Sequence, residues 1–353
     1  MKWRIKKDNG KYRLSRSAIA IISALSVICL VAITFGSCYV VFTRLSSDDI
    51  PIIIREDSED NIAEIDPDLE LLEEEPEDIT EDIYDPVPED AEARPIYQQD
   101  PIEEEIINIL IIGEDAHSDK TNGRSDIMML LSYDVKNNKA SLISFMRDTW
   151  VPIEGYGYNR LNATYAWGGA GLTINTINMV FDLDIQTYII VDFENTVELV
   201  DRLGGIEVII TDVEVNYYNR HFGWGIEKGI NKLDGKMALA HARNRKSDGA
   251  DFERTRRQRD IMLAVYEKIM GQRDIKTISD FINYTMVSID TNIRPEKMFL
   301  LAGVMFKDND LSIDQGRIPI DDSWDYASIE GKSVLVIDFE KNTGYLKDIL
   351  YMD

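Results

Sequence analysis

The stretch Ile106-Ile107-Asn108-Ile109-Leu110-Ile111-Ile112-Gly113 is a short, nearly continuous apolar run that ends in glycine. A run of this length and composition is typical of a strand that is buried on both faces of a sheet. Similar runs occur at 127–133, 142–145, 188–191, 206–210 and 334–337, and helical patterns occur at 172–181, 196–203, 236–245, 254–270 and 295–306. Strands that alternate with helices predict an α/β fold, a three-layer α-β-α sandwich with a central mixed sheet.

The N-terminal region predicts a membrane anchor. Residues 17–42 contain no charged side chain, and about 20 apolar residues suffice to cross a bilayer as a helix. A cleaved signal peptide has a shorter apolar core, of about 7 to 15 residues. Lysines and arginines dominate residues 1–16, and such a flank stays in the cytoplasm. We therefore expect a protein of the cell membrane with a cytoplasmic tail over 1–16, one uncleaved transmembrane helix over 17–43, and an extracellular C-terminal domain.

An acidic stretch separates this segment from the apolar run. Residues 48–105 carry 25 aspartates or glutamates against two arginines, which accounts for most of the net charge of −26. Such a composition buries too little apolar surface to fold alone, and like charges keep it extended. We expect a disordered spacer over 44–105 and a catalytic domain over 106–353. An acidic arm that binds cations or a basic partner is the alternative.

The cysteine content narrows the chemistry of that domain. Cys29 and Cys38 are the only cysteines, and both lie in the predicted anchor. A disulfide or a thiolate metal site is therefore excluded from the exported part.

A basic cluster predicts an anion site. Seven arginines or lysines fall within residues 241–259 of this acidic chain, among them Arg243, Arg245, Arg254 and Arg257. A guanidinium presents a fixed fork of donors that matches phosphate oxygens two at a time. The cluster therefore indicates a phosphate or pyrophosphate site, and a solvated helix face is the alternative.

Two loops at strand ends add charged candidates. Asp115 closes one predicted strand and Asp126 opens the next; two carboxylates at one sheet edge repel unless a cation lies between them, and Mg²⁺ prefers such ligands. Aspartates that cap turns are the alternative. Arg147 and Asp148 directly follow the run 142–145, where a charged pair needs partners. Arg147 is a candidate for the phosphate site with Asp148 orienting it, and a structural salt bridge is the alternative.

These segments together resemble the LytR-CpsA-Psr family of cell-wall polymer ligases, over residues 106 to about 270 and more weakly to about 350. The similar motifs are Asn108 to Asp115, Arg124-Ser125-Asp126-Ile127-Met128-Met129, Arg147-Asp148-Thr149, Leu161 to Gly169, Leu199 to Ile206, Leu233 to Arg245, and Asp251 to Gln258. Two positions depart from the family pattern: His117 stands where an arginine is frequent, and Met146 stands where proline is usual.

The resemblance implies a phosphotransferase that moves a glycopolymer such as teichoic acid from undecaprenyl pyrophosphate to peptidoglycan and forms a phosphodiester. It implies Mg²⁺, with Mn²⁺ as the alternative, on Asp115 and Asp126. The implied pyrophosphate ligands are Arg124, Arg147, Arg243, Arg245, Arg254, Arg257 and Gln258, and the implied catalytic residues are Arg147, Asp148, Arg243 and Arg245. A non-catalytic wall-binding or regulatory module and a lipid pyrophosphate hydrolase remain alternatives. The acidic balance and the outside topology argue against nucleic acid as a partner.

Overall fold

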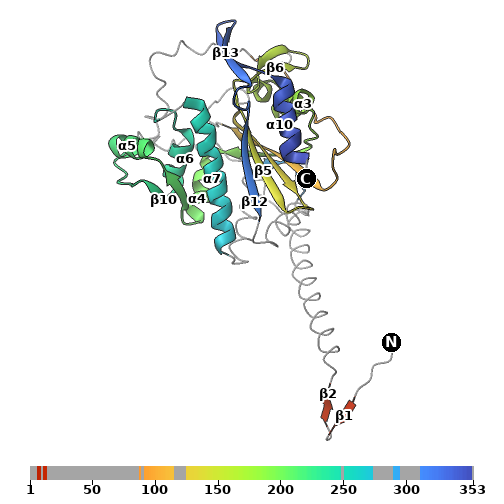
Figure 1. Cartoon of the computed structure of the whole chain (residues 1–353), viewed down its shortest axis with the longest axis vertical. Coiled ribbons are helices and arrows are strands. Elements are labelled where there is room, and N and C mark those ends of the chain that lie inside the picture. The colour runs from red at the N-terminus through yellow and green to blue at the C-terminus, as the bar shows by residue number, and fades with distance from the viewer. Residues whose placement is uncertain are drawn as a thin grey trace, which may run out of the picture. The chain divides into compact units, whose positions relative to one another are not determined.

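The computed structural model describes residues 6–8, 11–13, 87–88, 91–114, 125–247, 250–272, 289–294 and 311–351 (Figure 1). The chain divides into a unit over Met1–Ile65 and a unit over Asp66–Asp353. In the first unit, strands β1 (Lys6–Asp8) and β2 (Lys11–Arg13) pair antiparallel. None of the helices within the described ranges has the length and apolarity needed to cross a membrane. The predicted anchor over 17–43 and the predicted helix over 295–306 lie outside the described residues.

The second unit contains the folded domain. Its strands are β3 (Ile106–Glu114), β4 (Ser125–Asp134), β5 (Lys139–Phe145), β6 (Trp150–Ile153), β7 (Gly157–Arg160), β8 (Thr187–Asp192), β9 (Ile206–Ile210), β10 (Gly229–Leu233), β11 (Asp290–Thr291), β12 (Ser312–Ile318), β13 (Trp324–Ile329) and β14 (Lys332–Ile337). Its helices are α3 (Ala163–Phe181), α4 (Phe193–Arg202), α5 (Asp212–His221), α6 (Gly235–Arg243), α7 (Ala250–Gln272) and α10 (Phe339–Tyr351).

A six-stranded sheet with the order β11-β8-β3-β4-β5-β12 forms the centre of this unit. Strand β4 runs antiparallel to both of its neighbours, β3 and β5. The pairs β3–β8 and β5–β12 are parallel, and β11 is antiparallel to β8. The predicted mixed α/β fold is therefore confirmed.

Helices flank this sheet on opposite sides because alternate side chains of a strand point to opposite faces. Leu110 and Ile112 of β3 belong to the larger hydrophobic core, which includes Ile177 of α3 and Leu346 of α10. Ile111, between them, packs in a separate cluster that includes residues of α7. Figure 1 shows α10 and α7 on different sides of the sheet. Burial on both faces explains why β3 is an almost unbroken apolar run.

Two apolar runs that sequence analysis assigned to the buried sheet lie elsewhere. Strand β9 pairs only with β10 among the described strands, and its burial alternates, with Ile209 68% exposed. Strand β14 forms a hairpin with β13. Conversely, β12 completes the sheet although its sequence SIDQGRI is mostly polar, because it is an edge strand with one neighbour. Hydrophobicity of a short run indicates burial but not the sheet to which a strand belongs.

The folded unit begins before the predicted boundary at residue 106. The backbone amides of Arg94, Tyr97 and Ile102 donate hydrogen bonds to Gly168 O (3.1 Å), Asn175 Oδ1 (2.9 Å) and Asp184 Oδ2 (2.6 Å). The assignment of residues 94–102 to a disordered spacer is therefore wrong. The acidic composition of the segment as a whole concealed a few residues that bind α3 and the loop after it.

We predict that Gly171→Ala displaces this N-terminal segment. A Cβ at Gly171 would overlap the carbonyl oxygen of Arg94. We expect the free energy of unfolding to fall by about 1–3 kcal/mol, as in other overpacked sites. The matched control is Gly344→Ala in α10, where a Cβ meets nothing within 4 Å and helix propensity should add up to about 1 kcal/mol. Urea denaturation of both variants measures this difference, and equal stability of the two would contradict the placement of Arg94.

Candidate active site

The register of β4 and β5 brings an aspartate and an arginine together at one edge of the sheet. The strands are antiparallel with Met129 opposite Ser144, and continuing this register places Asp126 opposite Arg147. Arg147 Nη1 accordingly lies 3.0 Å from Asp126 Oδ1. The order of the strands thus brings together two residues that sequence analysis had assigned to separate loops.

The segment after α6 and the first turns of α7 add two arginines and a second carboxylate. Arg254 Nη2 lies 3.3 Å from Asp126 Oδ2, and Arg245 Nη2 lies 3.7 Å from the same oxygen. Asp251 Oδ1 contacts Arg245 Nε at 3.4 Å and Arg254 Nη1 at 3.6 Å, while its Oδ2 contacts Arg147 Nη2 at 3.4 Å. Three arginines from three segments therefore converge on two aspartates.

A third aspartate and a fourth arginine extend the group. Asp148 Oδ2 lies 3.4 Å from Arg147 Nε, and Asp148 Oδ1 lies 3.7 Å from Nη1 of Arg160, a side chain that is only 2% exposed. The arginine–aspartate cluster hereafter comprises Asp126, Arg147, Asp148, Arg160, Arg245, Asp251 and Arg254. Sequence analysis missed Arg160 and Asp251 as site residues. Their positions in the sequence could have indicated them, since Arg160 directly precedes one motif of the resemblance and Asp251 begins another.

Arg147 stays charged despite its burial. Burial lowers the pKa of its guanidinium, but the carboxylates of Asp126, Asp251 and Asp148 outweigh this effect and raise the pKa above its ordinary value. The four guanidiniums and three carboxylates of the cluster nearly compensate each other. A polyanion can bind here by taking over guanidinium donors that the aspartates hold in this structure.

The other predicted site residues either lie outside the described part of the chain or lie close to Arg245 and Arg254 in the sequence. Asp115, His117 and Arg124 lie outside the described residues. Arg243 is half-buried at the end of α6, two residues before Arg245. Gln258 is buried one helical turn after Arg254, on the same side of α7.

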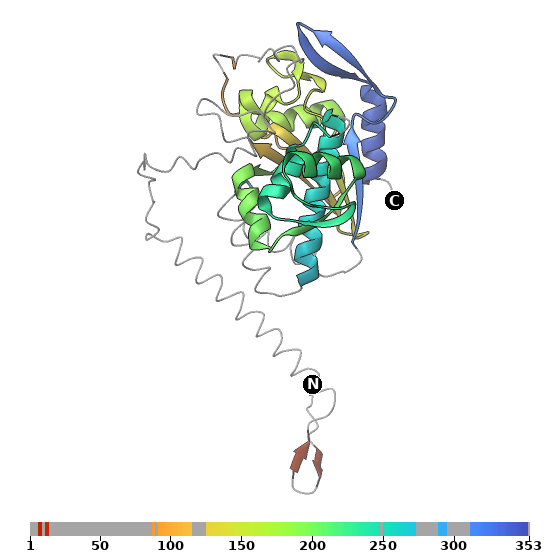
Figure 2. The same ribbon diagram turned by 90° about the vertical axis from the view of Figure 1, so that its left-hand side faces the viewer.

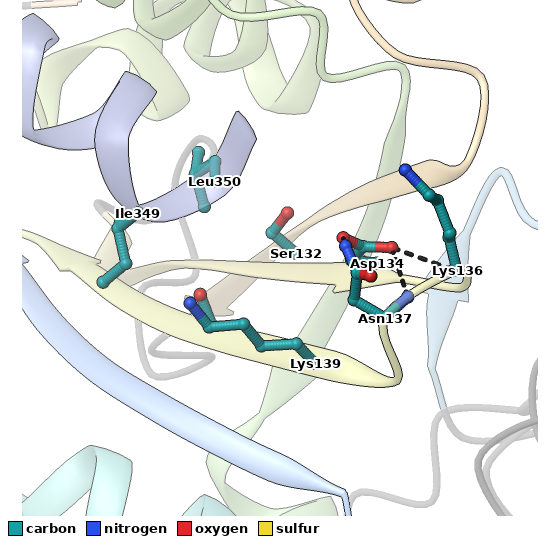
Figure 3. Close-up of a pocket in the computed structure, with 8 residues that line it drawn as sticks. Ser132, Asp134, Lys136, Asn137, Lys139, Ile349 and Leu350 are labelled. Atoms are coloured by element: carbon teal, nitrogen blue, oxygen red, sulfur yellow. Dashed lines mark hydrogen bonds between the residues drawn. The ribbon is translucent and has the colours of Figure 1, made fainter. Parts of the chain in front are cut away.

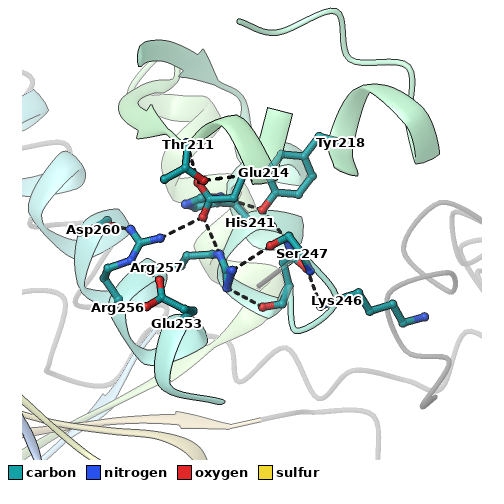
Figure 4. A network of polar contacts seen from close by, with 11 residues as sticks. Thr211, Glu214, Tyr218, His241, Lys246, Ser247, Glu253, Arg256, Arg257 and Asp260 are labelled. Carbon is teal, nitrogen blue, oxygen red and sulfur yellow. Dashed lines mark hydrogen bonds and ion pairs between the residues drawn. The ribbon is translucent and has the colours of Figure 1, made fainter. Parts of the chain in front are cut away.

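The predicted placement of Arg257 beside Arg254 requires a correction. Arg257 lies in a network around Glu214 (Figure 4), whereas Arg254 contacts Asp126 and Asp251. Its Nε donates to Glu214 Oε1 at 2.8 Å, its Nη1 to Asn244 O at 3.0 Å and its Nη2 to Ser247 Oγ at 2.9 Å. Three helical residues advance the direction of a side chain by about 300° rather than a full turn. Arg257 therefore faces α5 while Arg254 faces the sheet edge.

The carboxylate that receives Arg257 is fully buried. Burial raises the pKa of Glu214, but hydrogen bonds from Thr211 and Arg257 outweigh it and lower the pKa to about 2. Beside it, burial lowers the pKa of His241 to about 3, so this imidazole is neutral at pH 7. His241 Nδ1 lies 2.8 Å from the hydroxyl of Tyr218. The Glu214 network hereafter comprises Glu214, Thr211, Arg257, His241, Tyr218, Asn244 and Ser247.

The Glu214 network fixes the segment that carries Arg245. Asn244 Nδ2 donates to Tyr218 Oη at 2.9 Å and to Ser247 Oγ at 2.8 Å. Asn244 Oδ1 accepts from the backbone amides of Lys246 (2.9 Å) and Ser247 (3.2 Å). Arg245 lies between these contacts, so the network determines where its guanidinium enters the cluster.

Met146, where the resemblance led us to expect proline, has an apolar role. Its side chain is 2% exposed within the larger core, and its amide donates to Ile318 O at 2.8 Å. A proline lacks this donor. Met146 therefore ties the loop before Arg147 to the end of β12.

A cavity of about 310 Å³ lies at the other end of β4 and β5 (Figure 3). It is lined by Ser132, Asp134, Lys136, Asn137, Lys139, Ser141, Ile349 and Leu350. Asp134 there accepts hydrogen bonds from the turn amides of Lys136 and Asn137. Eight residues of strand, about 26 Å, separate Asp134 from Asp126. The cavity is therefore separate from the arginine–aspartate cluster.

Of the two aspartates predicted to hold a cation, the structure describes Asp126 alone. Within the described ranges, no group of three or more His, Cys, Asp or Glu side chains is arranged to hold a metal. Asp126 supplies hard carboxylate oxygens of the type that Mg²⁺ takes, although both of its oxygens contact arginines here. Its predicted companion, Asp115, lies outside the described residues.

We predict that Glu214→Gln destabilises the protein in a pH-dependent way. The pKa of Glu214 lies at about 2 in the folded state, below its ordinary 4.5. The ionised group therefore adds stability above pH 4.5, and this contribution is lost as the pH falls toward 2. We expect a loss of about 3 kcal/mol at pH 7 that shrinks by about 2 kcal/mol at pH 3.

The control for this prediction is Glu198→Gln. Glu198 pairs with Arg202 on an exposed helix face, where such pairs contribute less than about 1 kcal/mol. Urea denaturation at pH 7 and pH 3 measures both variants. A Glu214→Gln effect that is the same at both pH values would contradict the lowered pKa.

The chain is similar in sequence to known proteins. A polyisoprenyl-teichoic acid–peptidoglycan teichoic acid transferase TagU of Bacillus mycoides is 31% identical over 221 residues, which cover 62% of this chain and 71% of that protein. The regulatory protein MsrR of Staphylococcus aureus is 29% identical over 252 residues, which cover 70% of this chain and 75% of that protein. The chain is thus similar both to a protein named as an enzyme and to one named as a regulator.

A solved structure shares the fold. The protein YwtF (TagT) with bound octaprenyl pyrophosphate lipid superposes with a TM-score of 0.55 at 21% identity, covering 72% of this chain and 94% of that chain. The sequence profile of the LytR_cpsA_psr family matches residues 78–343, three quarters of the chain and the whole of the arginine–aspartate cluster. The chain therefore belongs to the LytR_cpsA_psr family.

Proposed function

We propose that this protein transfers a glycopolymer from a polyprenyl pyrophosphate, in bacteria undecaprenyl pyrophosphate, to peptidoglycan. The observation that carries the proposal is the convergence of Arg147, Arg245 and Arg254, from three separate segments, at one sheet edge. A diphosphate leaves water only where several charged donors replace its hydration. The names of a transferase relative and of a prenyl pyrophosphate complex in the same fold support this substrate class.

In the proposed reaction, a hydroxyl oxygen of peptidoglycan attacks the phosphorus that bears the polymer. The new P–O bond forms as the bond to the bridging oxygen breaks, and polyprenyl phosphate leaves with that electron pair. The hydroxyl proton passes to a base. Arg147, Arg245 and Arg254 stabilise the charge on the phosphoryl oxygens, which is the main requirement of phosphoryl transfer. Asp148 orients Arg147 and Arg160.

A divalent cation, Mg²⁺ or alternatively Mn²⁺, would be held by Asp126 together with Asp115. When bound, it would neutralise charge on the diphosphate and polarise its P–O bonds. We further propose that residues 17–43 anchor the protein in the membrane as a single span, with the N-terminus in the cytoplasm. A three-layer α-β-α domain outside would then reach the cell wall and a lipid-linked substrate.

A regulatory module without catalysis is the second candidate, since one relative is named a regulatory protein. A lipid pyrophosphate hydrolase would use the same charges with water as the acceptor. Incubation of the full chain with a lipid-linked glycopolymer and peptidoglycan distinguishes the three. A phosphodiester-linked polymer supports transfer, a released polymer phosphate supports hydrolysis, and binding without turnover supports the regulatory module.

We predict that Arg245→Lys weakens the binding of polyprenyl pyrophosphate at least tenfold, equivalent to ~1.4 kcal/mol. A lysine lacks the planar fork that engages two oxygens. Calorimetry in detergent measures the affinity, and thermal unfolding checks that the variant folds. The matched control, Arg202→Lys, changes an exposed helix pair and should leave the affinity unchanged. Wild-type affinity in Arg245→Lys would show that this arginine does not contact the ligand.

We also predict that Asp126→Asn lowers both transfer activity and stability. Repulsion between Asp115 and Asp126, as expected from the sequence, would by itself make this change neutral or stabilising. The ion pairs of Asp126 with Arg147, Arg245 and Arg254 favour the opposite sign, because the aspartate neutralises these arginines. We expect a loss of about 1–3 kcal/mol, typical of a hydrogen bond to a charged group. A variant that is as stable as the wild type in urea would contradict the pairing.

A further inference from the structure

The hairpin of β13 and β14 is attached to the segment that carries Arg147 and Asp148. The backbone amide of Leu335 donates to Asp148 O at 2.9 Å, and Thr149 forms a parallel bridge with Leu335. The hairpin, blue in Figure 2, extends beyond the helices from this attachment. Its position is therefore fixed relative to the arginine–aspartate cluster by backbone contacts.

A row of aromatic rings leads from the cluster onto this hairpin. Phe252 follows Asp251 of the cluster directly in the chain. Its ring centroid lies 4.8 Å from that of Trp324, and Trp324 lies 4.9 Å from Tyr326 in an edge-on arrangement. The guanidinium of Arg317 lies 4.5 Å from the centroid of Phe252. Arg317 thus packs against the row at its cluster end, and the other end of the row, at Tyr326, faces solvent.

The outer ring of the row is accessible. Tyr326 is 67% exposed, although Leu335, its cross-strand partner on the same face, is 2% exposed. Burial raises the pKa of the Tyr326 hydroxyl, and the nearby carboxylates of Asp251 and Asp148 raise it further. The exposed ring is therefore within electrostatic reach of the cluster.

We propose that Trp324 and Tyr326 bind a sugar ring of the lipid-linked donor beside its pyrophosphate. The inference rests on the proposed function. A pyranose presents a face of C–H groups, and the negative face of an aromatic ring attracts such groups while burying apolar area. Tyrosine and tryptophan offer a large rigid surface at a small conformational entropy cost.

The donor fits this platform better than the acceptor does. The first sugar of the donor is bonded to the diphosphate, so the arginines that bind the diphosphate also fix the position of that sugar. The aromatic row begins at Phe252, next in the chain to Asp251, which contacts Arg147, Arg245 and Arg254. A platform that starts at the phosphate site therefore meets the sugars nearest to the phosphate.

The test compares two ligands with the full chain in detergent, a sugar-bearing polyprenyl pyrophosphate and the same lipid without sugar. We expect Tyr326→Ala to weaken binding of the sugar-bearing lipid at least about threefold, the size of an aromatic contact, and to leave binding of the sugar-free lipid unchanged. Tyr326→Phe keeps the ring and should keep most of the affinity. Val336→Ala is the matched control, because Val336 is 41% exposed on the opposite face of the same hairpin.

The outcomes separate this inference from the proposed function. If the wild type binds neither lipid, the proposed function fails and the sugar platform fails with it. If the wild type binds both and Tyr326→Ala weakens neither or both equally, the platform is overturned and the proposed function stands. An unchanged donor affinity with a raised KM for peptidoglycan would assign the aromatic row to the acceptor and overturn the inference.

Discussion

Asp126 is the carboxylate on which the arrangement of the site depends. It contacts Arg147 from the loop after β5, Arg245 from the segment after α6 and Arg254 from the first turns of α7. Three guanidiniums this close would repel one another without carboxylates between them. Its position follows from the antiparallel pairing of β4 and β5, which brings the start of one strand beside the end of the other. The register of the sheet therefore determines the geometry of the cluster.

The Glu214 network performs a second structural task behind the cluster. Glu214 is ionised and fully buried, and Arg257 links it to the carbonyl of Asn244. A buried charge of this kind is stable only when its partners are all in place. The network therefore stiffens the connection between α6 and α7 at the point where Arg245 emerges. Arginines that look equivalent in the sequence therefore differ in their contacts. Arg245 and Arg254 belong to the arginine–aspartate cluster, whereas Arg257 binds Glu214 behind it.

The sequence predicted the class of fold and most of the cluster for physical reasons. The nearly continuous apolar character of residues 106–112 indicates burial on both faces, as in a sheet covered by helices. The same reasoning failed for β9 and β14, because a short apolar run does not reveal its pairing partner. It failed for Arg257 because helical spacing gives the relative direction of side chains but not which helix they face. Asp251 and Arg160 were missed because their roles arise from contacts between segments far apart in the chain.

The paired state of the cluster bears on how it would recognise the proposed diphosphate substrate. In this structure the guanidiniums already have carboxylate partners, so binding of a diphosphate is an exchange of partners rather than a simple gain of ion pairs. The net affinity is the difference between two sets of charge-assisted hydrogen bonds. A diphosphate offers more oxygens than a carboxylate and can engage several guanidiniums at once. The exchange leaves Asp126 and Asp251 without their present partners, and a partly buried carboxylate is stabilised by a compensating cation. Binding of the proposed diphosphate substrate and of the proposed divalent cation would therefore favour each other, since each removes the charge that the other would leave unpaired.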